Sequence, residues 1–143
     1  MKLRSLLIPA FALTLASFNI AAADASKPIL FIVTSESLQT QGMSMVLANA
    51  LIKQGHSVDV LLCDGAGDLA LKSHNSQLLK PMGVTPEGLM KTLMQAGGRV
   101  NVCALYLPNK SVGREALRDS VGVANPADVA SMISNPDVKV VSN

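Results

Sequence analysis

Two cysteines, Cys63 and Cys103, are the side chains of this chain with the most distinctive chemistry. A cysteine thiolate is a nucleophile and a soft metal ligand, so the pair could form a disulfide, carry sulfur or hold a metal. The two cysteines stand 40 positions apart, which excludes a CxxC redox motif. Two cysteines are also too few for a fold that disulfides hold together.

Polar side chains accompany the cysteines at the ends of predicted strands. Ser35 and Glu36 follow the first strand, Asp64 follows Cys63 at the end of the second, and Lys110 comes after the third. The carboxyl ends of parallel strands meet at one edge of a sheet, which is where such folds bind ligands. We therefore expect a pocket at this edge, although Ser35 and Glu36 could instead cap the first helix.

Cations near Cys103 could favour its thiolate. Lys110 and Arg114 follow Cys103 closely, and a helix beginning near Val112 would direct its amides toward the same edge. Positive charge lowers the pKa of a thiol. The alternative is that both basic residues belong to an ordinary solvated helix face.

The elements that position these residues alternate between strand and helix. Residues 28–34 (PILFIVT) form a continuous apolar run, typical of a buried central strand. A helix over 38–54 follows, with Met43 and Leu47 on its predicted apolar face. Residues 57–62 predict the second strand.

The second half of the chain repeats the alternation. Thr85 caps a helix that ends at Gly97, residues 99–106 predict a third strand, and 112–119 a short helix. A helix capped by Asn125 and running from Pro126 to about Ile133, and a strand over 138–141, then close the chain. The order predicts one three-layer α/β/α domain with a mostly parallel sheet of about five strands.

The N-terminus has the pattern of a secretory signal peptide. Lys2 and Arg4 precede an uncharged apolar stretch over 5–20, and the alanines of 21–23 suit a signal peptidase. We expect cleavage before Asp24, leaving a single domain of residues 24–143 in the periplasm. A retained membrane anchor is the alternative.

Charge excludes one class of partner. Without Lys2 and Arg4 the mature chain has ten basic and ten acidic residues, no tryptophan and no basic run. It therefore lacks the electrostatic footprint of a nucleic-acid-binding protein. We therefore expect that the mature chain binds no nucleic acid and, after signal cleavage, no membrane.

The order of elements resembles that of the DsrE family of sulfur-relay proteins. The resemblance spans the strand at 29–33, the helix at 48–51, the closing segment 138–142 and, most distinctively, the third strand 99–105 (RVNVCAL). It implies that Cys103 accepts a sulfane sulfur as a persulfide and passes it between a donor and an acceptor. It also implies a homo-oligomer, a trimer or hexamer, and no cofactor.

Cys63 is not part of the relay motif. It could resolve a persulfide or disulfide on Cys103, or pair with it. If the first strand lay between the two cysteine-bearing strands, these would be about 9.5 Å apart, which is too far for a disulfide.

Two other functions remain open. The chain could be a non-catalytic binding or assembly module with structural cysteines. It could instead bind Cu(I) through cysteine and methionine sulfur, although helical spacing favours core packing of the methionines and we expect no metal. The methionines concerned are Met43, Met45, Met82, Met90 and Met94.

Overall fold

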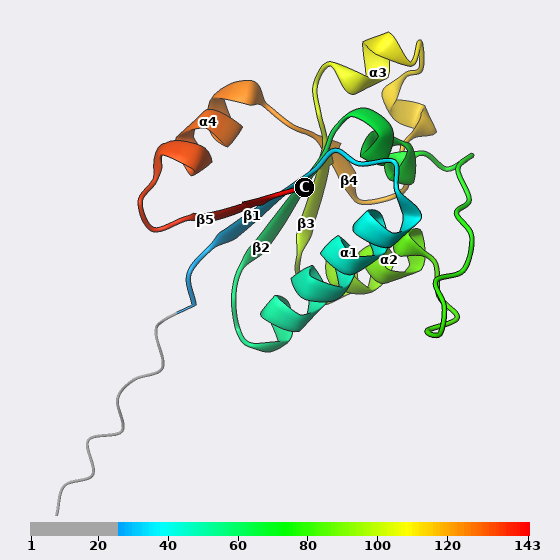
Figure 1. Cartoon of the computed structure of the whole chain (residues 1–143). Helices are drawn as coiled ribbons and strands as arrows, with labels where there is room; N and C mark the ends of the chain where they lie inside the picture. The colour runs from blue at the N-terminus through cyan, green and yellow to red at the C-terminus, as the bar shows by residue number, and fades with distance from the viewer. Residues whose placement is uncertain (1–25) are drawn as a thin grey trace, which may run out of the picture.

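The computed structural model describes residues 26–143, so the predicted signal peptide over residues 1–23 lies outside the described part. Five parallel strands form one sheet in the order β4-β3-β2-β1-β5 (Figure 1). The strands are β1 (Ile29–Val33), β2 (Val58–Leu62), β3 (Arg99–Val102), β4 (Val121–Val123) and β5 (Lys139–Ser142). The predicted parallel α/β architecture of about five strands is confirmed.

Helices cover the two faces of the sheet unequally. The helices α1 (Leu38–Lys53) and α2 (Pro86–Gln95) pack together on one face, and α4 (Pro126–Ser134) lies on the other side (Figure 1). This is the predicted three-layer arrangement. No residue of α4 is buried, so the core lies almost wholly between the sheet and the α1–α2 layer.

The strand order corrects one expectation. The central strand is β2 and not β1, because β2, β3 and β4 add successively on one side of β1. The crossover through α4 then returns the chain to the other side of β1, where β5 pairs with it. As a result, β2 and β3 are direct neighbours.

Side-chain and backbone pairing fixes the register between β2 and β3. Asp59 pairs with Arg99, and Leu62 with Val102. Across the first pair, the Arg99 guanidinium donates to both oxygens of Asp59, at 2.6 and 2.8 Å. Asp59 is buried, so this bidentate ion pair satisfies a carboxylate that would otherwise be costly there.

The predicted inner face of α1 is wrong. Met43 and Leu47 are 57% and 46% exposed, whereas Gln41, Met45 and Ala48 are buried. Apolar residues occur around the whole circumference of this helix, so the sequence contains more than one stripe at helical spacing. Only packing against the sheet and α2 selects between them.

Short elements form the carboxyl edge of the sheet. They are the 3₁₀ segments η1 (Asp64–Ala70) and η2 (Arg114–Ala116) and the four-residue helix α3 (Tyr106–Asn109). The third strand therefore ends at Val102, four residues earlier than predicted, and η2 replaces the expected helix over 112–119. Within residues 26–143, no helix has both the length and the apolar character needed to cross a bilayer.

Candidate functional site

The two cysteines occupy equivalent positions on neighbouring strands. Each immediately follows a paired residue, because Leu62 of β2 stands opposite Val102 of β3. The Cys103 amide donates to the Leu62 carbonyl at 2.8 Å, and the Cys63 amide donates to the Val33 carbonyl at 2.9 Å. The first strand does not lie between the two cysteine-bearing strands, so the separation of about 9.5 Å that this arrangement would give does not apply. Adjacent strands are only about 4.8 Å apart.

The side chains of Cys63 and Cys103 lie beside each other, and both cysteines are free and partly exposed. Burial, the close contact with Cys103 and the charge of Cys103 raise the pKa of Cys63 to about 12. Cys63 therefore keeps its proton near neutral pH. Its thiol can donate to the Cys103 sulfur, which leaves Cys103 as the sulfur free to act as nucleophile.

Cys103 faces a pocket of about 430 Å³ at the carboxyl edge of the sheet. Three of the predicted site residues, Glu36, Asp64 and Lys110, line this pocket with it. Cys63 touches Cys103 but does not line the pocket. Ser35 is also outside the lining, and its Oγ accepts from the Ser37 amide at 3.1 Å. The complete lining is Glu36, Asp64, Gly65, Asp68, Cys103, Leu105, Tyr106, Asn109 and Lys110.

Close backbone packing after β2 shapes the pocket. Asp64 adopts a left-handed φ of 48°, which turns the chain sharply after Cys63. A Cβ on Gly65 would stand 2.6 Å from the Cβ of Glu36, and the ring of Tyr106 fills the space that a Cβ on Gly67 would need. The two glycines thus allow Glu36 and Tyr106 to approach η1.

A Tyr106–Asp68–Lys110 network forms one wall. Lys110 Nζ lies 2.7 Å from Asp68 Oδ1, and the Tyr106 hydroxyl donates to the same oxygen. Burial alone would raise the pKa of Asp68, but the hydrogen bonds from Lys110 and Tyr106 outweigh it and hold that pKa below its usual value. Burial and the bond to Asp68 raise the pKa of Tyr106.

This network changes the expected role of the basic residues. The charge of Lys110 is paired with Asp68, so only part of its field is available to favour a Cys103 thiolate. Arg114 belongs to η2 and is not among the residues that line the pocket.

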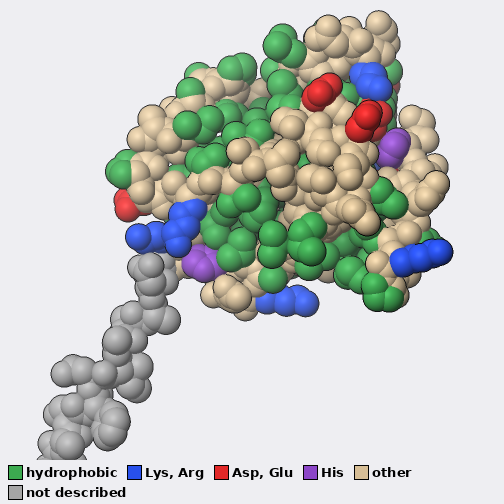
Figure 2. All heavy atoms as spheres, in the orientation of Figure 1, with side chains coloured by type: hydrophobic (Ala, Val, Ile, Leu, Met, Phe, Trp, Pro, Cys, Tyr) green, Lys and Arg blue, Asp and Glu red, His purple; other side chains and the backbone are tan. Residues whose placement is uncertain are grey.

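The pocket is acidic. With Lys110 and Asp68 paired, the carboxylates of Glu36 and Asp64 remain in its lining. Figure 2 shows acidic and basic side chains close together at the end of the molecule that carries α3. Negative charge at short range disfavours small anions and favours neutral or cationic partners.

Sequence reasoning missed Tyr106, Asp68 and Gly67. Tyr106 is the only tyrosine of the chain, but the predicted third strand over 99–106 includes it, and a strand position gives no sign of its contact with Asp68. The early end of β3 and the start of α3 at Tyr106 bring its ring over η1.

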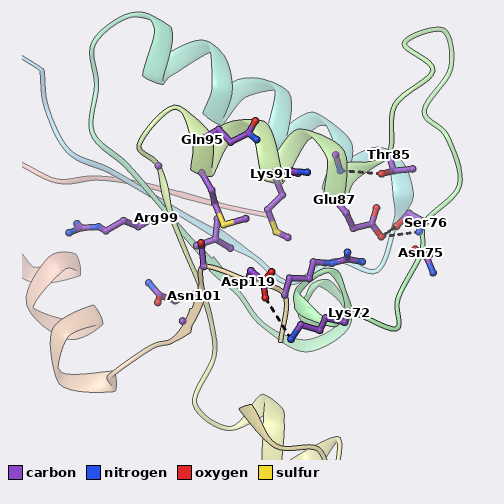
Figure 3. A pocket seen from close by; sticks show the side chains of 18 residues that line it. Lys72, Asn75, Ser76, Thr85, Glu87, Lys91, Gln95, Arg99, Asn101 and Asp119 are labelled. Carbon is purple, nitrogen blue, oxygen red and sulfur yellow. Dashed lines mark hydrogen bonds and ion pairs between the residues drawn. The ribbon is translucent and has the colours of Figure 1, made fainter. Parts of the chain in front are cut away.

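A second, larger cavity of about 910 Å³ lies between α2 and the β3–β4 side of the sheet (Figure 3). Some of its polar groups pair with one another, whereas the second carboxylate oxygen of Glu87, Oε2, is buried without a hydrogen-bond partner among the described residues. Glu87 Oε1 accepts from the Ser76 amide and hydroxyl at 2.9 and 2.7 Å, and Lys72 lies 3.7 Å from Asp119. Neither cysteine lines this cavity, so it holds no thiol nucleophile.

The methionines do not converge on the cysteines. Met45 and Met90 are fully buried in the core. Helical spacing predicted this position for Met90. Met43 and Met82 are more than half exposed, so the expected core position of Met43 is wrong. Within residues 26–143, no cluster of three or more His, Cys, Asp or Glu side chains is placed to hold a metal ion.

Known structures place this architecture in a fold class. No family model matches the chain, and no curated protein matches it. Two solved structures share its fold and show it to be the DsrE-like α/β fold.

The first of these structures is the ychN protein from E. coli, with a TM-score of 0.66 and 17% identity over 81% of this chain and 99% of that chain. The second is MTH1491 from Methanobacterium thermoautotrophicum, described as a protein of unknown function. Its TM-score is 0.57, with 12% identity over 82% of this chain and 100% of that chain. At these identities the likeness establishes the fold.

Proposed function

We propose that this chain is an exported, periplasmic sulfur carrier that holds sulfane sulfur as a persulfide on Cys103. The observation that carries the proposal is the position of Cys103. Its sulfur faces a pocket at the carboxyl edge of the sheet and contacts Cys63, a thiol that stays protonated. The DsrE-like fold supports the same function by analogy with sulfur-relay proteins of that fold.

Loading needs no cofactor and no oxidant. The Cys103 thiolate attacks a sulfane sulfur of the donor, a new S–S bond forms, and the donor's S–S bond breaks with its electron pair leaving on the donor sulfur. The Cys63 thiol can donate a hydrogen bond to Cys103 in the resting state. Transfer to an acceptor thiolate is the same exchange in the opposite direction.

The charge of the pocket bears on the kind of donor and acceptor. Glu36 and Asp64 surround the approach to Cys103 with negative charge. A protein partner with basic residues around its own reactive thiol fits this rim better than thiosulfate or another small anion. Inorganic polysulfide remains a suitable chemical probe, because it can be supplied in excess.

Treatment of the purified protein with polysulfide should add a mass of about 32 Da, the mass of one sulfur atom. The added mass should disappear on treatment with a dithiol reductant, which removes a persulfide sulfur as sulfide. Intact-protein mass spectrometry measures both steps. A wild-type mass that stays unchanged would count against the carrier function.

Export is the other part of the proposal. It rests on the basic residues Lys2 and Arg4, the apolar stretch over 5–20 and the alanines that precede Asp24. Protein recovered from the periplasm should therefore begin at Asp24, as N-terminal sequencing would show. Recovery of the protein from the cytoplasm with its first 23 residues intact would contradict export.

A structural pair of cysteines is the second candidate function, and one observation favours it. Cys63 and Cys103 follow adjacent strands directly, and the usual strand spacing of about 4.8 Å falls within the Cα separation that disulfides span. In that case protein purified without reductant would hold a stable disulfide and take up no sulfur.

A further inference from the structure

Cys63 is a second thiol that simple sulfur storage on Cys103 does not require. It follows β2 directly, its side chain contacts the Cys103 sulfur, and backbone hydrogen bonds to Val33 and Leu62 hold the two cysteines in place. Neighbouring parallel strands bring facing Cα atoms to about 4.8 Å, within the range of about 4.4–6.8 Å that disulfides span. The sheet itself therefore presents a second sulfur to whatever Cys103 carries.

We propose that Cys63 is the resolving thiol of this site, which discharges a persulfide on Cys103 as sulfide and leaves a Cys63–Cys103 disulfide. The inference rests on the proposed carrier function and deepens it, because it assigns a sulfide-releasing reaction to the same site. With this reaction the protein reduces one persulfide sulfur to sulfide and then stops, because both of its thiols have been oxidised. A dithiol reductant then restores both thiols for the next turnover.

The step balances without any other reagent. The Cys63 sulfur attacks the Cys103 Sγ atom, the Sγ–sulfane bond breaks, and its electron pair leaves on the terminal sulfur. The proton of the Cys63 thiol passes to the leaving hydrosulfide, which gives H₂S. The sulfane sulfur is reduced to sulfide, and the two cysteine sulfurs are oxidised to one disulfide.

The environment of Cys63 sets the pH dependence of this step. Burial is the largest cause of its raised pKa, followed by the contact with Cys103 and the nearby charge of Asp64. A thiol with a raised pKa has little thiolate at neutral pH, so the persulfide on Cys103 survives long enough to be transferred. Below the pKa of Cys63, the thiolate fraction and hence the release rate should rise about tenfold for each pH unit.

The test follows the fate of a loaded sulfur in wild-type protein, Cys63→Ser and Cys63→Ala. Each protein is loaded with inorganic polysulfide, desalted without oxygen, and followed by intact mass and by sulfide release. In the wild type, the adduct of about 32 Da should give way to a species about 2 Da lighter than the reduced protein, with one sulfide released. Both variants should keep the adduct at least about ten times longer.

The outcomes separate this inference from the function on which it rests. Loading of all three proteins with equal adduct lifetimes would overturn the role of Cys63 and leave the carrier function standing. Absence of the adduct from all three would overturn both. Loss of the wild-type adduct without a disulfide would also contradict the inference, because it would mean that the sulfur leaves by another route. Agreement between the serine and alanine variants shows that the effect comes from the missing thiol.

Discussion

Replacement of Cys103 by serine should abolish sulfur loading completely, whereas replacement of Cys63 by serine should leave it intact. Cys103 lines the pocket, whereas Cys63 does not, and burial together with the contact with Cys103 raises the pKa of Cys63 to about 12. A hydroxyl cannot form the S–S bond of a persulfide. Intact mass after polysulfide treatment should therefore show no adduct in Cys103→Ser.

The Cys63→Ser protein is the matched control for this result. Like Cys103→Ser, it lacks one thiol of the wild-type protein, but it keeps Cys103, the proposed nucleophile. If Cys103→Ser loaded as well as wild type while Cys63→Ser did not, the roles assigned to the two cysteines would be reversed. Circular dichroism should show that both variants are folded, since both substituted side chains are partly exposed.

Truncation of Phe31 should give the largest effect on stability. Phe31 lies in β1, is 1% exposed, and packs in the core between the sheet and the α1–α2 layer. Replacing a buried phenylalanine by alanine removes its burial and leaves a cavity, which costs about 3–5 kcal/mol. Urea denaturation followed by circular dichroism should show this loss in the free energy of unfolding.

The control for this prediction is Ile133→Ala on α4. Ile133 is 51% exposed and belongs to a helix without buried residues, so its truncation should change the free energy of unfolding by no more than about 0.5 kcal/mol. Equal effects of the two substitutions would contradict the assignment of the core to the α1–α2 side of the sheet.

Local signals predicted much of the fold correctly. The apolar run at 28–34 became β1, Thr85 caps α2 through a 3.1 Å bond to the Gly88 amide, and the Asn125 side chain caps α4. Each of these features depends on residues close together in the chain. The order of the strands depends on where each crossover places the next strand, which local sequence does not contain.

In the candidate site, too, the features that depend on local sequence were predicted and those that depend on the strand order were not. Cys63 and Cys103 were expected at one edge of the sheet, because carboxyl ends of parallel strands meet there. Their contact was not predicted, since it required β2 and β3 to be neighbours. The link between Tyr106, Asp68 and Lys110 was also missed, because it depends on β3 ending at Val102.

The central claim is that Cys103 carries the sulfur, and peptide mapping of the loaded protein tests it most directly. Wild-type protein is alkylated immediately after polysulfide treatment, before Cys63 can discharge the persulfide, so that the persulfide is trapped with its sulfane sulfur. The protein is then digested and analysed by tandem mass spectrometry. The account predicts the extra sulfur on the peptide that contains Cys103. An extra sulfur found only on the peptide that contains Cys63, or on neither peptide, would contradict it.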